Sequence, residues 1–324
     1  MVSHPPRTTS GPSSTTRRRC AGSGLVAALA ATAALAGCST TSASASSTSG
    51  KIVAIGAENE YANVMSQIGG RYVQVSSILN NPNTDPHTFE SSPSVAQEVS
   101  AATLVVQNGV GYDTFMNTIE SASPNSKRKV IDVQRLLRLP DSTPNPHLWY
   151  SPKTMPAVAR AVATDLSEIL PTHAAYFEAN ATTFISSLRP WLADIAKVKA
   201  TFPGAPVATT EPVGDYMLQA AGTDDLTPWS FSADVMNGVD TTPQDNSFQE
   251  NLFNDHKIRV FVYNQQVTNP ITRLLLSLAH TDGIPVVGVY ETMPVPGYDY
   301  QTWMEAEVTA LDRALVAGTS TERL

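Results

Sequence analysis

Short apolar runs alternate with segments of helical periodicity along most of the chain, from Lys51 onwards. This alternation is typical of a β-α-β succession, in which strands are parallel and helices cover the sheet. In the first half, strands are expected at residues 52–55, 73–79, 104–106 and 130–133. Helices are expected at residues 60–68, 94–100 and 113–121, and a fourth starts at Ser151-Pro152 and ends near residue 169.

The second half repeats this plan. Strands are expected at residues 207–210, 260–263 and 286–290. Helices are expected at residues 213–221, 271–279 and 301–316. The sequence therefore predicts an α/β protein with two lobes, each with a central, mainly parallel four-stranded sheet flanked by helices.

The segment between the halves carries apolar side chains at intervals of three, four or seven residues, as one helix face does. They are Phe177, Phe184, Leu188, Trp191, Ile195 and Val198. One helix here would be about 39 Å long and could join the lobes as a long linker helix. Pro190 interrupts the pattern, so two shorter helices are one alternative, and a core helix within a single domain is another. The expected domains are an N-terminal lobe at residues 51–170, the linker helix at 171–200 and a C-terminal lobe at 201–324.

Residues 1–37 have the layout of a secretory signal, with four arginines, no acidic residue and then an apolar run. The run is about a dozen residues long, and a helix needs roughly 20 to span a bilayer, which disfavours a membrane span. It ends at Leu35-Ala36-Gly37-Cys38, which resembles a bacterial lipoprotein box. We expect Cys20 to leave with the signal and Cys38 to carry a lipid that anchors an extracytoplasmic protein to the cell membrane.

Residues 38–50 are mostly Ser, Thr, Ala and Gly, and we expect a flexible tether there. Loss of the four signal arginines changes the formal net charge from −8 to −12. Such an acidic protein suits cations and disfavours nucleic acid as a partner.

Two histidines occupy matching turns. Asp85-Pro86-His87 recurs sixty residues later as Asn145-Pro146-His147. Each proline fixes its own φ and favours an extended residue before it, so each imidazole stands on a short, stiff turn. Such paired imidazoles suggest metal ligands; the alternative is that the turns arose by chance and the histidines are ordinary surface or core residues.

Two glutamates follow predicted strands directly. Glu211 comes after residues 206–210, and Glu291 comes after residues 285–290, while both histidines also lie past strand ends. Ligands in open α/β sheets gather outside the carboxyl ends of the strands. Two imidazoles and two carboxylates would make a mixed site for Mn²⁺, Zn²⁺ or Fe²⁺, and the absence of sulfur disfavours Cu⁺. Each glutamate alone is as well explained by a helix cap or a solvated charge.

These residues carry a family resemblance over about residues 51–316. Its motifs are Asp85-Pro86-His87-Thr88-Phe89-Glu90, Asn145-Pro146-His147-Leu148-Trp149, Thr210-Glu211-Pro212 with Tyr216, and Glu291-Thr292-Met293-Pro294. They resemble the zinc- and manganese-binding lipoproteins that serve ABC importers. The resemblance implies two α/β lobes joined by a rigid long helix, with one metal ion between them held by His87, His147, Glu211 and Glu291.

The chain departs from the commonest pattern of that family. Asn145 stands where many members have Asp, the third ligand is Glu211 instead of His, and the fourth is Glu291 where Asp is usual. The loop rich in His and acidic residues of many zinc-specific members is missing. The sequence therefore leaves Zn²⁺ and Mn²⁺ both open as the bound ligand.

The main hypothesis is a lipid-anchored receptor that captures a divalent transition metal, delivers it to an ABC permease and catalyses nothing. We also expect a monomer. A secreted metallohydrolase using the same residues is the alternative, which needs an open coordination position for water and a general base. A surface adhesin stabilised by the metal is a third reading.

Other polar residues are assigned structural roles. Gly109-Val110-Gly111 lacks the third glycine of a dinucleotide loop and is expected to form a strand-to-helix turn. We expect His256 and His280 to be structural or exposed, and Asp113, Asp240 and Asp245 to be caps or turns. Asp85 is expected to orient a histidine ligand, and Asn145 can do so only as a neutral partner.

Overall fold

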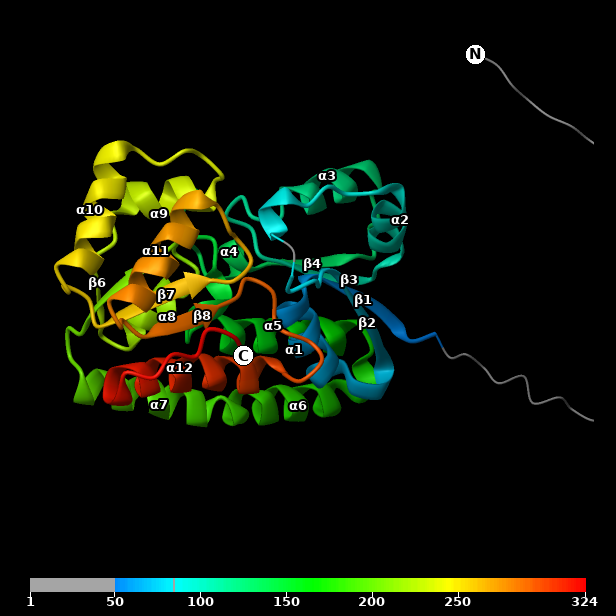
Figure 1. The fold of residues 1–324 in the computed structure, drawn as a ribbon. Coiled ribbons are helices and arrows are strands. Elements are labelled where there is room, and N and C mark those ends of the chain that lie inside the picture. Colours follow the sequence, from blue (N-terminus) through cyan, green and yellow to red (C-terminus); the bar gives the residue numbers. More distant parts are fainter. Residues whose placement is uncertain (1–49, 84) are drawn as a thin grey trace, which may run out of the picture. The chain divides into compact units, whose positions relative to one another are not determined.

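The computed structural model describes residues 50–324 except residue 84 (Figure 1). The expected signal at residues 1–37, Cys20, Cys38 and all but the last residue of the tether lie outside the described residues. Within the described part, no helix is both long enough and apolar enough to cross a membrane.

The first sheet is parallel throughout and has the order β2-β1-β3-β4. Its strands are β1 Ile52–Glu58, β2 Val73–Leu79, β3 Leu104–Gln107 and β4 Lys129–Asp132. The helices of this lobe are α1 Asn59–Gly69, α2 Pro93–Ala101, α3 Thr114–Ala122, α4 Val133–Leu136 and α5 Thr154–Ile169. All four predicted strands are therefore present.

Several predicted boundaries in this lobe differ from the structure by one to three residues, and β1 continues to Glu58 where residue 55 was expected. Two of the differences have a local cause. Val133 is not in β4, because the Asp132 side chain accepts a hydrogen bond from the backbone of Arg135 at 3.0 Å and caps α4. The predicted helix at Ser151-Pro152 begins instead at Thr154. The chain first makes a 3₁₀ turn at Leu148–Tyr150, and Ser151 stays extended as the residue that ends it.

The second sheet is also parallel and has the order β6-β5-β7-β8. Its strands are β5 Pro206–Thr209, β6 Asp224–Asp225, β7 Val260–Asn264 and β8 Val286–Val289. The helices of this lobe are α8 Asp215–Ala220, α9 Trp229–Met236, α10 Pro243–Asn254, α11 Pro270–Thr281 and α12 Tyr300–Ala317. The sequence did not locate β6, α9 or α10, whereas the four-stranded parallel architecture of both lobes is confirmed.

Between the sheets lie α6 Ala174–Ser187 and α7 Arg189–Thr201, which Figure 1 shows end to end. Leu188 separates them, and Pro190 lies in the first turn of α7, where a missing N–H costs no intrahelical bond. The structure therefore has two shorter helices here, the alternative to one long linker helix. Each of these two helices packs against one lobe: α6 contacts α1 and α5 of the first lobe, and α7 contacts α12 of the second.

The two sheets share a core through their inner faces. Because side chains alternate along a strand, Ala54, Leu104 and Ile131 of the first sheet and Val207, Val260 and Val287 of the second enter one hydrophobic cluster. This cluster also contains the buried side chains of α6, α7 and α12. The outer faces are covered separately, by α2 and α3 in the first lobe and by α9, α10 and α11 in the second. The carboxyl ends of the strands carry the candidate site.

Candidate metal centre

The two x-Pro-His turns have the same local structure. The Oδ1 atom of Asp85 accepts a hydrogen bond from the backbone N–H of His87 at 2.8 Å. The Oδ1 atom of Asn145 does the same for His147 at 3.0 Å. The sequence repeat is therefore a structural repeat. Among the described contacts, Asp85 bonds to the backbone of the His87 turn and not to its imidazole.

The imidazole of His147 is fully buried and held in one tautomer. Its Nδ1 atom lies 2.8 Å from the Oδ1 atom of Asn145, which already faces the His147 backbone N–H. An amide oxygen can only accept, so Nδ1 carries the proton and Nε2 keeps its lone pair. The side-chain amide of Asn108 donates to the Pro146 carbonyl at 2.8 Å and so also holds this turn in place.

The two imidazoles approach the same carboxylate oxygen of Glu291. Its Oε2 atom lies 3.0 Å from Nε2 of His87 and 3.3 Å from Nε2 of His147. The hydroxyl of Tyr112 donates to the same oxygen at 3.0 Å. Among the described residues, His87, His147 and Glu291 form the one group of three whose ligand atoms all lie within 4.8 Å of one another. A lone pair of Nε2 facing a carboxylate oxygen requires a cation between them, either a proton or a metal ion.

The pKa shifts suit this arrangement. Burial acts to raise the pKa of Glu291, but the close approach of the His147 and His87 imidazoles outweighs it and holds that pKa well below its usual range. Burial lowers the pKa of His147, which keeps this imidazole neutral. Burial also acts to lower the pKa of His87, yet hydrogen bonding and attraction to Glu291 leave it raised. Glu291 and His147 are thus in the protonation states that metal ligands need.

Glu211 lies beside this group but outside it. It is buried, its Oε1 atom accepts a hydrogen bond from Nδ2 of Asn264 at 2.8 Å, and its Oε2 atom has no hydrogen-bond partner. Burial raises the pKa of Glu211 well above its usual range, and the nearby charge of Glu291 adds to the rise. An unpartnered oxygen of this kind is costly unless a proton or a cation satisfies it.

Asn264 was missed by the sequence analysis. Its amide donates a second hydrogen bond to Oε1 of Glu291 at 2.7 Å, so one Nδ2 atom joins both glutamates. It is the last residue of β7, the position directly after the predicted strand at residues 260–263. The glutamates were selected because each is a polar residue at the end of a buried strand. The same rule selects Asn264.

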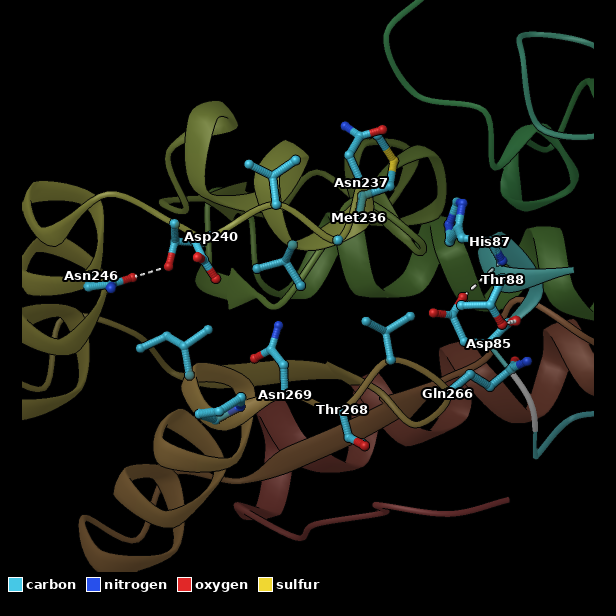
Figure 2. Close-up of a pocket in the computed structure, with 17 residues that line it drawn as sticks. Asp85, His87, Thr88, Met236, Asn237, Asp240, Asn246, Gln266, Thr268 and Asn269 are labelled. Carbon is cyan, nitrogen blue, oxygen red and sulfur yellow. Dashed lines mark hydrogen bonds between the residues drawn. The ribbon is translucent and has the colours of Figure 1, made fainter.

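A cavity of about 740 Å³ opens beside His87 (Figure 2). Asp85, His87 and Thr88 line one end of it, and Asp240 and Asn246 line the other. The His87 side chain is 24% exposed, whereas those of His147 and Glu291 are 0% exposed. The cavity therefore reaches the site at His87.

Asp113, His256 and His280 hold the structural places expected of them, whereas Asp240 lines the cavity. Asp113 accepts hydrogen bonds from the backbone N–H groups of Asn108 and Gly109, at 2.6 and 2.9 Å. Residues 109–111 all have positive φ and form the turn between β3 and α3. His280 is exposed and pairs with Glu322, and His256 lies in the turn after α10. These contacts explain the residues without a ligand.

Comparison with known families gives one match over most of the chain. The family model described as "ZnuA: Zinc-uptake complex component A periplasmic" matches residues 57–314.

Curated relatives match over shorter stretches. The manganese-binding lipoprotein MntA of Bacillus subtilis is 27% identical over 137 residues, which is 40% of this chain and 44% of that protein. A putative metal-binding protein of Thermotoga maritima is 26% identical over 170 residues, 52% of this chain and 61% of that protein. The chain thus spans about half the length of the curated relatives it matches.

Solved structures share the fold over nearly the whole described chain. The periplasmic zinc-binding protein TroA of Treponema pallidum is 18% identical, with a TM-score of 0.69 over 84% of this chain and 100% of that chain. A Mn-bound periplasmic metal-binding protein of Candidatus Liberibacter asiaticus is 18% identical, with a TM-score of 0.68 over 82% of this chain and 100% of that chain.

Proposed function

Since the chain belongs to the ZnuA family of periplasmic zinc-uptake components, we propose that it captures a divalent transition metal ion and delivers it to an ABC permease. The ion is the cargo, either Zn²⁺ or Mn²⁺. Its proposed ligands are His87, His147, Glu291 and Glu211. The protein catalyses no reaction, and the relatives reported above are named for metal binding, not for catalysis.

The observation that carries this proposal is the convergence of three ligand atoms. Nε2 of His87 and Nε2 of His147 both face Oε2 of Glu291, within 4.8 Å of one another. Imidazole nitrogen and carboxylate oxygen together suit Zn²⁺ and also Mn²⁺. Glu211 supports the proposal as a fourth ligand because its buried Oε2 atom has no other partner.

The proposed location follows from the same family membership. We propose that Cys38 carries a lipid that holds a monomeric protein at the outer face of the cell membrane. The lipoprotein-box pattern at residues 35–38 supports this, as does the name of the lipoprotein MntA. The division into lobes at residues 51–170 and 201–324 likewise stays a proposal.

Removal of one imidazole tests the site. In His87→Ala and in His147→Ala, we expect stoichiometric binding of Zn²⁺ and Mn²⁺ to be lost, because each variant replaces one of the two nitrogen donors by water, with a large loss of affinity. His280→Ala is the matched control, since His280 is exposed and its partner is Glu322.

The measurement is a competition titration against a chelator, with circular dichroism to show that each variant is folded. Undiminished affinity in His147→Ala would remove His147 from the site. Equal losses in all three variants would show that the effect does not arise at these ligands.

A further inference from the structure

Asn264 holds the two proposed carboxylate ligands with a single amide group. Its Nδ2 atom donates one hydrogen bond to Oε1 of Glu211 at 2.8 Å and the other to Oε1 of Glu291 at 2.7 Å. Asn264 is fully buried, so water does not compete for these contacts. Both donor hydrogens of the amide are therefore used on the two carboxylates.

The orientation of this amide is fixed from its other side. Oδ1 of Asn264 accepts a hydrogen bond from the backbone N–H of Gln266 at 3.0 Å. A flipped amide would place its NH₂ group against that N–H and its oxygen against two carboxylates, which gives only repulsive pairs. The backbone N–H of Asn264 in turn donates to the hydroxyl of Thr210 at 3.0 Å. The donors consequently point at Glu211 and Glu291 and at no other group.

The second oxygen of each carboxylate is in a different situation. Oε2 of Glu291 faces the two imidazoles, at 3.0 and 3.3 Å. Oε2 of Glu211 is buried without a hydrogen-bond partner. Each carboxylate thus has Oε1 engaged by the Asn264 amide and Oε2 left as the oxygen for a cation, although the Tyr112 hydroxyl also donates to Oε2 of Glu291.

The difference between the two oxygens of each carboxylate matters because Zn²⁺ and Mn²⁺ coordinate different numbers of oxygen ligands. Zn²⁺ is satisfied by four ligands in a tetrahedron. Mn²⁺ favours octahedral, oxygen-rich sites of roughly six donors, which carboxylates can supply by binding through both oxygens. An amide N–H on one oxygen of each glutamate disfavours that two-oxygen mode, since the bidentate ion would have to compete with a charge-assisted hydrogen bond.

We propose that Asn264 determines the metal preference of the site by holding Oε1 of Glu211 and of Glu291, so that each binds through Oε2 alone and the site favours Zn²⁺ over Mn²⁺. This inference rests on the proposed function of these residues as metal ligands. Asn264 itself touches no metal and acts as a specificity-determining residue through the two carboxylates.

The test compares two variants of Asn264 with a matched control. Asn264→Leu removes both donors at similar volume. Asn264→Ala removes both donors without adding a charge beside Glu211 and Glu291, and it replaces the leucine variant if that variant does not fold. Gln249→Leu is the control, because Gln249 is also a fully buried amide of the second lobe but donates to Thr209 and Thr227 instead of a carboxylate.

The readouts are the dissociation constants of Zn²⁺ and Mn²⁺ by chelator competition, and the number of oxygen neighbours of bound metal by X-ray absorption. We expect the ratio of the Mn²⁺ constant to the Zn²⁺ constant to fall about tenfold or more in the Asn264 variants, equivalent to about 1.4 kcal/mol. The number of oxygen neighbours of Mn²⁺ should rise, and Gln249→Leu should keep the ratio of the unmodified protein.

Two results would overturn the inference. One is an unchanged ratio in a folded Asn264 variant, even if both affinities drop together. The other is an equal change of the ratio in Gln249→Leu. Failure of the proposed function has a separate signature, because the unmodified protein would then bind neither ion.

Discussion

Glu307 is a fully buried carboxyl group on α12 that the proposed site does not use. Its Oε1 atom accepts hydrogen bonds from Trp303 at 2.9 Å and from Tyr150 at 3.1 Å, and its Oε2 atom has no partner. Burial raises the pKa of Glu307 from 4.5 to about 8, against the effect of these hydrogen bonds. The folded protein therefore keeps a proton that the unfolded chain releases at lower pH.

A pH dependence of stability follows from this residue. Between pH 4.5 and about 8 unfolding releases the proton of Glu307, so rising pH favours the unfolded state and the stability is lost through this window. In Glu307→Gln this contribution is absent. We expect the free energy of unfolding of the unmodified protein to fall by up to ~3 kcal/mol more than that of the variant between pH 5.5 and 8.5.

Denaturant unfolding at the two pH values measures this difference. Any pH-independent cost of the amide cancels in the comparison. Asp215, whose pKa burial also raises to about 8, contributes equally to both proteins. Parallel pH profiles for the variant and the unmodified protein would show that Glu307 is ionised in the folded state.

At the scale of single residues, the sequence predicted those candidate ligands that a local pattern marks. His87 and His147 were found because their turns repeat, and Glu291 because it follows a buried strand. Asn264 was overlooked although the strand-end rule that selected the glutamates also selects it. Tyr112 was not found because it reaches Glu291 from the turn after β3 in the other lobe. That contact depends on how the lobes pack, which no local pattern encodes.

Among the elements, the start of α1 is fastened to the loop that carries Glu291. The Nδ2 atom of Asn59 donates to the Met293 carbonyl at 2.9 Å, and the Met293 N–H donates to Oδ1 of Asn59 at 3.0 Å. Asn59 is 6% exposed and Met293 is 2% exposed. This pair links the first lobe to the loop after β8 in the second.

Asn59→Ala should leave two buried backbone groups of Met293 without partners. We expect the free energy of unfolding to fall by roughly 2 to 6 kcal/mol, since each of the two unpaired buried groups costs about 1 to 3 kcal/mol. Metal affinity should fall as well, because Met293 is two residues from Glu291. Asn80→Ala is the control, as Asn80 is exposed and bonds only to Ser77 in the described contacts. Chemical denaturation and metal titration check both effects, and equal behaviour of the two variants would contradict a role for the Asn59 contact.

The elements themselves were predictable where an apolar period is strong. The strand β2 was predicted to the residue, whereas β6 consists of Asp224 and Asp225 and has no apolar residue to mark it. The strand β6 forms because the backbone at Asp224 and Asp225 pairs with β5, which is tertiary information. The break at Leu188 was foreseeable only as an alternative, since Pro190 is compatible with a kink and with a new helix.

For the whole molecule, the proposed attachment to the membrane depends on Cys38, which lies outside the described residues. We expect Cys38→Ser to release the protein from the membrane fraction, because the lipid is its only proposed anchor. Cys20→Ser is the matched control and should remain attached, since Cys20 lies within the proposed signal. Cell fractionation followed by immunodetection measures this. Recovery of Cys38→Ser in the membrane pellet would refute the lipid anchor.

The turn that carries His147 is hydrogen-bonded to both lobes through the two residues before the histidine. Asn108 of the first lobe holds the Pro146 carbonyl at 2.8 Å, and the Asn145 amide donates to the Pro212 carbonyl of the second lobe at 2.7 Å. A partner that pulls the lobes apart would therefore load in tension the two residues directly before His147. Because proline fixes its own φ, Pro146 has little freedom to absorb that strain. For His147 as a proposed metal ligand, this gives a mechanical route to release at constant pH and without a competing ligand.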